Sequence, residues 1–94
     1  MRAVWTPQAE DDLVAVVRSL DDFSSGAGDR FVEQLLTRLT SLEAFPRLGR
    51  MVPEYGIPVL REIIVRNYRL IYELFPDRIE IVAVRRGAEQ LPTE

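Results

Sequence analysis

The sequence predicts an α+β fold in which a helical hairpin packs on one face of a small, curved, mainly antiparallel sheet. Apolar residues recur every three or four positions in the first half of the chain, which indicates amphipathic helices. Short runs rich in β-branched and aromatic residues, separated by turn residues, fill the second half, which indicates strands. The predicted order is β-α-α-β-β-β, within a single domain of residues 1–94.

The first segment, residues 2–6, is short, apolar and aromatic, which favours a strand. A helix over about residues 7–21 follows it. Thr6 suits the N-cap of this helix, because its hydroxyl can accept a hydrogen bond from an otherwise unpaired backbone N–H. Pro7 suits the first helical position, where its missing backbone donor is not needed. The first strand is therefore expected to pass directly into the first helix.

A second helix is predicted over about residues 26–45, where apolar residues again recur at helical spacing. Ser24 or Ser25 is expected to cap its start. The helix must end near Phe45, because Pro46 disfavours the helical conformation of the residue before it. Two helices joined by so short a loop predict an αα-hairpin with a shared apolar seam.

A proline- and glycine-rich loop leads to three predicted strands, and a tail of residues 87–94 follows them. The strands cover about residues 59–65, 68–75 and 78–86. Arg66-Asn67 separates the first two, and Asn67 tolerates the positive φ that a two-residue hairpin turn needs. Pro76-Asp77 separates the last two, with proline suited to the first central turn position.

These turns predict which side chains share a face of the sheet. Ile64 is expected to face Arg69, and Arg69 to face Val84. One face is then nearly all apolar and lies under the helices: Val59, Arg61, Ile63, Val65, Tyr68, Leu70, Tyr72, Leu74, Ile79, Ile81, Ala83 and Arg85. The other face mixes apolar and charged residues and is expected to stay open: Leu60, Glu62, Ile64, Arg69, Ile71, Glu73, Phe75, Arg78, Glu80, Val82, Val84 and Arg86. A bulge would exchange the two faces beyond it.

Composition excludes several classes of function. The 94 residues contain no Cys, His or Lys, so thiol nucleophiles, imidazole bases and the usual zinc sites are not available. No run of apolar residues is long enough to span a membrane. The net charge of −3 argues against general nucleic-acid binding, which normally needs a clearly basic protein. We expect a cytoplasmic protein with neither a metal ion nor a cofactor.

Several motifs, in order, resemble those of the RelE/ParE toxin superfamily. They are Trp5-Thr6-Pro7-Gln8-Ala9, Phe45-Pro46-Arg47-Leu48-Gly49-Arg50, Leu60-Arg61-Glu62, Asn67-Tyr68-Arg69-Leu70-Ile71-Tyr72 and a last strand that ends in arginines. The resemblance implies a toxin of a type II toxin–antitoxin pair, silenced by a cognate antitoxin. ParE-like members inhibit DNA gyrase, and RelE-like members cleave mRNA on the ribosome without a metal.

The residues favour the ParE-like branch. A RelE-like nuclease would use Arg69, Arg85, Arg86 and Glu62, but the chain has no His, no Lys and no Tyr after Tyr72. Arginine does not readily donate or accept the proton that RNA cleavage requires. We therefore expect a binding inhibitor of gyrase, with an mRNA endonuclease as the first alternative. A degenerate toxin that acts only as an interaction module is the second.

The candidate contact residues follow from the predicted open face and from the apolar surplus of the helices. The expected target contacts are Arg69, Arg78, Arg85 and Arg86. The expected antitoxin contacts are Val14, Leu36, Ile71 and Phe75. Structural alternatives remain open at this point: Arg69 can instead pair with Glu62 or Glu80 across the strands, and the helical residues can simply widen the core.

Overall fold

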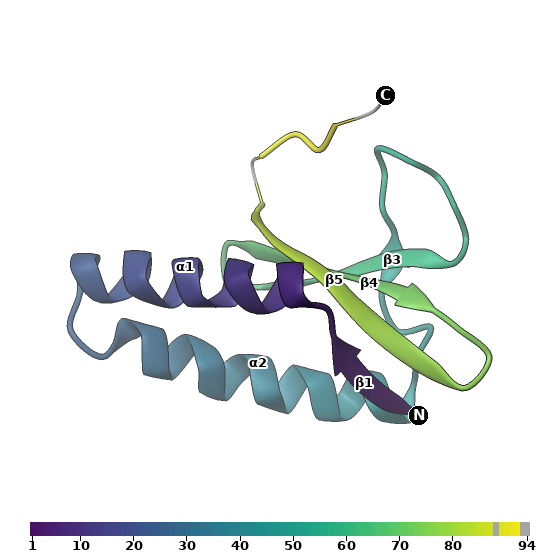
Figure 1. Ribbon diagram of the computed structural model, residues 1–94, viewed down its shortest axis with the longest axis horizontal. Helices are drawn as coiled ribbons and strands as arrows, with labels where there is room; N and C mark the ends of the chain where they lie inside the picture. The colour runs from purple at the N-terminus through teal and green to yellow at the C-terminus, as the bar shows by residue number, and fades with distance from the viewer. Residues whose placement is uncertain (88, 93–94) are drawn as a thin grey trace.

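The computed structural model describes residues 1–87 and 89–92. Two helices pack on one face of a five-stranded mixed sheet with strand order β1-β5-β4-β3-β2 (Figure 1), which confirms the predicted α+β fold. The elements are β1 (Arg2–Trp5), α1 (Pro7–Phe23), α2 (Ala27–Ala44), β2 (Arg50–Met51), β3 (Leu60–Val65), β4 (Tyr68–Leu74) and β5 (Arg78–Arg86). The short strand β2 was not predicted. Among the helices described, none combines the length and apolarity that a membrane crossing requires.

The start of α1 follows from its capping residues. Thr6 is the N-cap, and its Oγ1 accepts a hydrogen bond of 3.2 Å from the backbone N–H of Ala9. Pro7 occupies the first helical position. The helix continues to Phe23 instead of ending near residue 21, so the connection to α2 is short.

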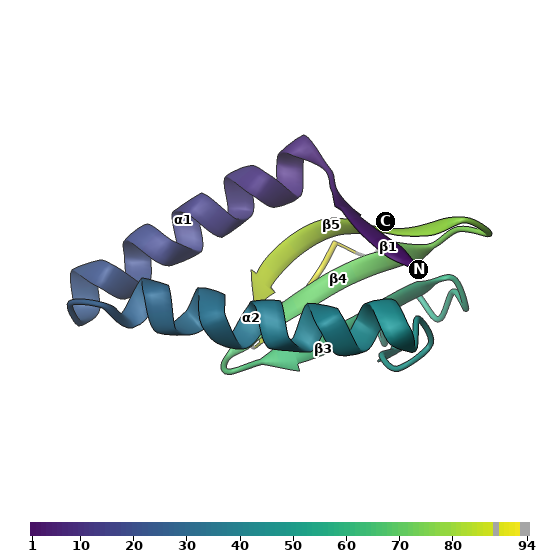
Figure 2. The ribbon, with the colours of Figure 1, turned by 90° about the horizontal axis from the view of Figure 1, so that it is seen from below.

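The start of α2 differs from the prediction. Gly26, not Ser24 or Ser25, occupies its N-cap with φ of 82°. Because glycine has no side chain, the cap residue makes no side-chain hydrogen bond to the helix. Asp21 of α1 takes over this role, because its Oδ1 accepts a hydrogen bond of 2.8 Å from the backbone N–H of Gly28. The two helices therefore meet closely at one end and diverge towards the other (Figure 2).

The hairpin between β3 and β4 has the predicted pairing. Ile64 faces Arg69, and β4 begins immediately after the two-residue turn. Arg66, rather than Asn67, takes the positive φ of this turn, with a value of 54°. A left-handed conformation is unusual for a residue with a long side chain.

The pairing of β4 with β5 contains a β-bulge. Tyr72 faces Ile81 and Ile71 faces Ala83, so that Val82 has no partner. The extra residue turns the later side chains of β5 to the opposite face. Nothing in the alternating pattern of the sequence marks the position of this bulge.

The predicted faces are therefore wrong for the end of β5. Arg69 faces Arg85 instead of Val84, and Tyr68 faces Arg86. Val84 and Arg86 consequently lie on the helix side of the sheet, whereas Arg85 lies on the side of Arg69. Arg85 and Arg86 therefore lie on opposite faces of the sheet, and each lies on the face that the predicted register had assigned to the other.

The main core lies between the helices and the sheet. Its buried members are Ala9, Val16, Phe31, Leu35, Leu39, Leu42, Ile63, Val65, Leu70, Tyr72, Ile79, Ile81 and Val84. Within it, the rings of Phe31 and Tyr68 pack edge to face with centroids 5.3 Å apart. Burial of this much apolar surface is the main stabilising contribution to the fold.

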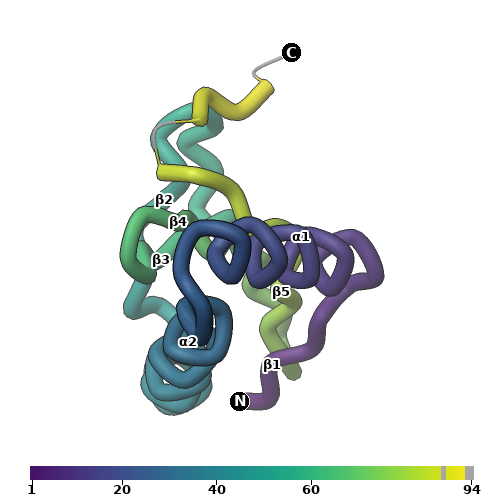
Figure 3. Tube along the Cα trace, turned by 90° about the vertical axis from the view of Figure 1, so that its left-hand side faces the viewer, coloured from purple at the N-terminus to yellow at the C-terminus, as the bar shows by residue number. Residues whose placement is uncertain are grey.

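The opposite face of the sheet is only partly open. A second, smaller cluster of Val52, Ile71 and Leu91 covers it. Val52 comes from the loop after β2, and Leu91 from the predicted tail, which crosses the sheet on the side away from α2 (Figure 3). The expectation of a fully open face is thus wrong, although Ala88, Thr93 and Glu94 of the tail lie outside the described residues.

Candidate functional site

Arg69 lies at the centre of an ion cluster that is buried except for Arg50. Its Nε donates a hydrogen bond of 2.7 Å to Glu62 Oε1, and its Nη1 and Nη2 donate to the two oxygens of Glu54 at 2.8 and 2.6 Å. Arg50 Nε donates to the other oxygen of Glu62 at 2.7 Å. The side chain of Arg69 is only 4% exposed, so two carboxylates surround it and little solvent reaches it. We call Arg50, Glu54, Glu62 and Arg69 the ion cluster.

The C-terminal segment closes the ion cluster. Arg69 Nη1 donates a further hydrogen bond of 3.2 Å to the carbonyl oxygen of Glu89, and the backbone N–H of Leu91 donates to Glu54 Oε2 at 3.2 Å. Hydrogen bonding from the guanidinium lowers the pKa of Glu54 to about 2, and hydrogen bonding to Glu54 raises the pKa of Arg69. Arg69 is therefore a fixed and compensated cation.

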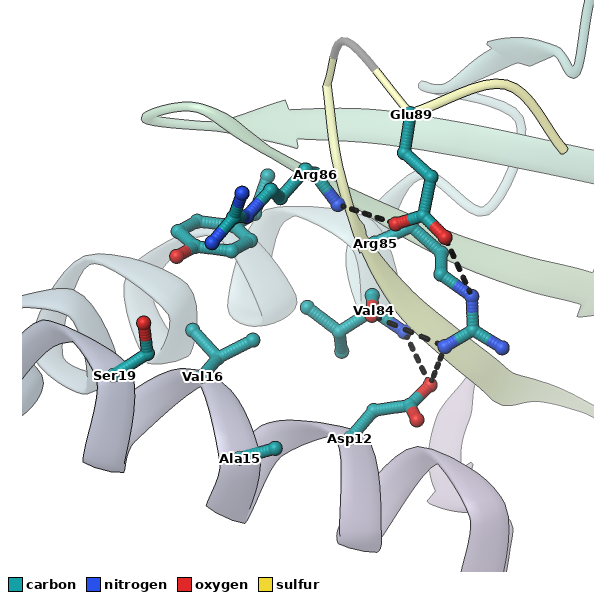
Figure 4. A pocket seen from close by; sticks show the side chains of 9 residues that line it. Asp12, Ala15, Val16, Ser19, Val84, Arg85, Arg86 and Glu89 are labelled. Atoms are coloured by element: carbon teal, nitrogen blue, oxygen red, sulfur yellow. Dashed lines mark hydrogen bonds and ion pairs between the residues drawn. The ribbon is translucent and has the colours of Figure 1, made fainter.

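A groove lies between α1 and the end of β5 (Figure 4). One hollow of about 390 Å³ is lined by Asp12, Ala15, Val16, Ser19, Tyr68, Val84, Arg85, Arg86 and Glu89. A second hollow of about 650 Å³ is lined by Ser19, Leu20, Phe23, Ile64, Arg66, Asn67, Tyr68, Arg86 and Gly87. The two hollows share Ser19, Tyr68 and Arg86, and we call them together the α1–β5 groove.

Acidic side chains hold Arg85 at one end of the α1–β5 groove. Asp12 Oδ2 accepts hydrogen bonds from the backbone N–H of Val84, at 3.0 Å, and from Arg85 Nη1. Glu89 Oε2 lies 4.0 Å from Arg85 Nε (Figure 4). Asp12 thus joins α1 to β5, in addition to any favourable interaction with the helix dipole.

Arg86 and Arg66 leave the other end of the groove basic. Arg86 is exposed, and its guanidinium forms no ion pair with the residues that the structure describes. Arg66 Nε donates a hydrogen bond of 2.8 Å to the neutral amide of Gln34. Phe23 and Ile64, which are 94% and 41% exposed, lie beside these cations. Cations and exposed apolar side chains together are typical of a protein-binding surface.

Arg78 lies at the other end of β5 from Arg86. It forms ion pairs with Glu80 and Asp77, and its guanidinium carbon lies 4.3 Å from the centroid of the Phe75 ring. Hydrogen bonding to Glu80 and then to Asp77 raises the pKa of Arg78. The structure therefore brings only Arg85 and Arg86, of the four predicted target contacts, into one groove.

The four predicted antitoxin contacts do not form one surface. Val14 and Leu36 are 50% and 57% exposed, which does not fit the alternative that they widen the core. Ile71 is 4% exposed in the second cluster, so the expectation that it lies on an open face is wrong. Phe75 is half-buried and lies under Arg78.

Most of the groups that metal-free RNA cleavage would use are paired or buried, whereas Arg86 is exposed and has no ion pair among the described residues. Arg69 and Glu62 compensate each other within the ion cluster. The Tyr72 hydroxyl accepts a hydrogen bond of 2.9 Å from the backbone N–H of Gly49 and donates one of 2.7 Å to the Pro46 carbonyl, and burial raises the pKa of Tyr72. In the described part of the chain, no three acidic side chains converge to hold a metal ion.

Three residues of these sites escaped the sequence analysis. Glu54 lies in an irregular loop, where no periodic pattern indicates its partners. Asp12 binds β5, and nothing near it in the sequence indicates a partner on so distant a strand. Phe23 lies beyond the predicted end of the first helix near residue 21, so the apolar pattern did not assign it to that helix.

Comparisons with known proteins identify the family of this chain. The family model of the ParE toxin of the type II toxin–antitoxin system parDE matches residues 3–91. The toxin RelE2 of Caulobacter vibrioides is 32% identical over 88 residues, which cover 93% of this chain and 96% of that toxin. The chain therefore belongs to the ParE toxin family, and it is a toxin of the ParE/RelE superfamily of type II systems.

Solved structures show the same fold. The chromosomal ParDE system of P. aeruginosa matches with a TM-score of 0.75 and 18% identity, over 92% of this chain and 95% of that one. A YoeB/ParE toxin from Agrobacterium tumefaciens matches with a TM-score of 0.65 and 17% identity, over 92% and 98% of the two chains. A mutant E. coli toxin RelE, solved with an antitoxin RelBc peptide, matches with a TM-score of 0.63 and 21% identity, over 95% and 84%.

Proposed function

We propose that this toxin acts by binding, as a ParE-like inhibitor of DNA gyrase in the cytoplasm, and that a cognate antitoxin neutralises it. The compensation of Arg69 carries the proposal. Two carboxylates already bind this guanidinium, so it cannot stabilise the negative charge that develops on a phosphate during RNA cleavage without breaking the ion cluster.

The α1–β5 groove supports a protein target. Arg86 and Arg66 lie beside exposed Phe23 and Ile64, and interfaces between proteins commonly combine arginine with aromatic and aliphatic side chains. Inhibition of this kind needs shape and charge complementarity rather than an acid and a base. The proposed target contacts are therefore Arg86 and Arg85. Arg85 lies at the end of the groove where Asp12 and Glu89 hold it.

Purified toxin can be tested in two parallel assays. A gyrase supercoiling assay should show loss of supercoiling at stoichiometric toxin, and primer extension on mRNA in a translating extract should show no new cleavage sites. Ribosome-dependent cleavage with unaffected gyrase would overturn the proposal in favour of the RelE-like activity. No effect in either assay would overturn it in favour of an interaction module.

Matched variants locate the contact. Arg86→Ala should weaken gyrase inhibition, whereas Arg47→Ala should not, because Arg47 is also an exposed arginine but lies in the loop after α2 and does not line the groove. Equal inhibition by both variants and the parent would remove Arg86 from the target-binding surface.

A further inference from the structure

We propose that the loop between β2 and β3 carries a second part of the target-binding surface, and that it accepts an acidic segment of the target with apolar side chains. This inference rests on the proposed function, because it extends the target-binding surface beyond the α1–β5 groove. The loop projects from the sheet on the side away from α2 (Figure 3). None of its residues lines the groove.

Large apolar side chains of this loop remain exposed. Four of them lie between the last residue of β2 and the residue before β3, and we call them the loop surface: Met51, Tyr55, Ile57 and Val59. Their exposed fractions range from 37% for Tyr55 to 47% for Ile57. Several large apolar side chains in one exposed segment are typical of a surface that another molecule covers.

Hydrogen bonds anchor the loop at several points. Arg61 Nε donates a hydrogen bond of 2.9 Å to the carbonyl oxygen of Pro58, and Arg61 Nη1 donates one of 3.0 Å to the carbonyl oxygen of Gly49. The backbone N–H of Tyr55 donates to the carbonyl oxygen of Val52 at 3.1 Å, and Val52 itself is buried. A surface that is already ordered loses little conformational entropy when a partner covers it.

The exposed charge beside the loop surface is positive. The side chain of Arg50 is 63% exposed despite its bond to Glu62, and Arg61 forms no ion pair with the residues that the structure describes. The one acidic residue between these arginines, Glu54, is 9% exposed and is bound to Arg69. Carboxylates of a partner can therefore form charge-assisted hydrogen bonds here, whereas a second copy of the same surface would bring like charges together.

A third hollow connects the loop with the α1–β5 groove. Its volume is about 320 Å³, and its lining includes Arg50 and Pro53 as well as Gly87 and Glu89 of the C-terminal segment. Glu89 also lines the first hollow of the groove, and Gly87 lines the second. The six residues of β3 separate the loop from the turn at Arg66 by roughly 20 Å. An ordinary protein interface of about 800 Å² on each partner is large enough to contact both regions at once.

An acidic protein segment fits the loop surface better than a nucleic acid does. Binding of a phosphate backbone depends on several cations, and only Arg50 and Arg61 lie beside the four apolar side chains. A protein segment can cover Ile57 and Val59 with apolar side chains and can also supply carboxylates for the arginines. Inhibition of the target should therefore depend on the loop surface as well as on Arg86.

The first test places a negative charge on the loop surface of the full-length toxin. Ile57→Glu should lower toxicity at least tenfold in a growth assay with titrated induction in cells without an antitoxin. It should also raise at least tenfold the toxin concentration that half-inhibits gyrase supercoiling. Leu36→Glu, which changes an exposed leucine on α2, should leave both values within twofold. Both positions are exposed, so circular dichroism and urea unfolding should match the parent.

The second test examines the charge of the partner. Ile57→Arg removes the same apolar contact as Ile57→Glu but adds a cation, so its toxicity should exceed that of Ile57→Glu at least fivefold. With purified gyrase, a photocrosslinking side chain at position 57 should form a crosslink, whereas the same side chain at position 36 should not.

Toxicity of Ile57→Glu equal to that of the parent would overturn the inference, whatever the target is. Equal losses in the two position-57 variants would overturn the acidic partner. Self-association or nucleic-acid binding of the parent that Ile57→Glu abolishes would overturn it as well, since the occupant would then be a second copy or a nucleic acid. A parent toxin that poisons cells but leaves gyrase unaffected would end the gyrase proposal alone, and the growth assay would still decide on the loop surface.

Discussion

Arg69 and Arg86 lie on the neighbouring strands β4 and β5, but the two surroundings have little in common. Arg69 is 4% exposed and bonded to two carboxylates and a carbonyl oxygen. Arg86 is exposed at the end of its strand and has no ion-pair partner among residues 1–87 and 89–92. One residue type thus forms a structural link on one face of the sheet and remains an exposed cation on the other.

The difference shows that a matching family motif does not by itself assign a role to a residue. Arg69 stands where the resemblance to RelE-like nucleases implies a catalytic cation, yet Glu54 and Glu62 hold it in the ion cluster. The bulge at Val82 then places Arg86 on the helix side, beside α1. Burial and partners, rather than residue type, decide which arginine can meet another macromolecule.

The largest expected effect comes from Arg69→Ala. The substitution leaves buried carboxylates without their cation, and a broken buried ion pair costs about 3 kcal/mol. Urea unfolding should therefore show a large loss of stability, and toxicity should fall through loss of folded protein. A variant as stable as the parent but without toxicity would instead return Arg69 to the functional site.

Arg86→Ala should leave the stability of the fold nearly unchanged but reduce toxicity. A surface substitution of this kind changes the free energy of unfolding by less than about 0.5 kcal/mol. Toxicity should nevertheless fall at least tenfold in a growth assay with titrated induction, and Arg47→Ala serves as the control. Unchanged toxicity at equal expression would show that the end of β5 is not a contact.

Glu54→Gln should remove part of the pH dependence of stability. The pKa of Glu54 is lowered from 4.5 to about 2 in the folded state, so its pairing stabilises the fold above pH 4.5, and this contribution is lost as the pH falls from 4.5 towards 2. Urea titrations between pH 6 and pH 2 should give a flatter profile for the variant. Parallel profiles would mean that Glu54 does not hold Arg69 in solution.

The smallest effect is expected at the turn between β3 and β4. Arg66→Asn places a residue that tolerates positive φ at the strained position, which should stabilise the protein by about 0.5 kcal/mol. The same substitution removes a cation from the rim of the groove. A loss of stability would indicate that the bond to Gln34 outweighs the backbone strain.

Local sequence signals predicted the helical hairpin, the order of the long strands and the start of α1 at Thr6. These features depend on periodicity and on single turn or capping residues, which neighbouring positions in the sequence reveal. The bulge at Val82 was missed, because a valine in a run of apolar residues fits either face of a strand.

The surfaces were harder to predict than the elements. Leu91 lies in a segment with no periodic pattern, and its burial against Val52 and Ile71 depends on contacts between residues far apart in the chain. Glu54 was missed for the same reason, since an acidic residue in a loop gives no sign of a buried partner. The sequence therefore provided candidate arginines, whereas their burial and their partners depend on contacts between distant residues.

The triple variant Glu54→Gln/Glu62→Gln/Arg69→Gln tests the central claim most directly, because it replaces Arg69 and both of its carboxylate partners with neutral side chains that can still hydrogen-bond. Its folding is first verified by circular dichroism and urea unfolding. The folded variant is expected to inhibit gyrase supercoiling within threefold of the parent toxin. A folded variant that leaves gyrase unaffected would contradict it, since the charge of Arg69 would then be needed for activity.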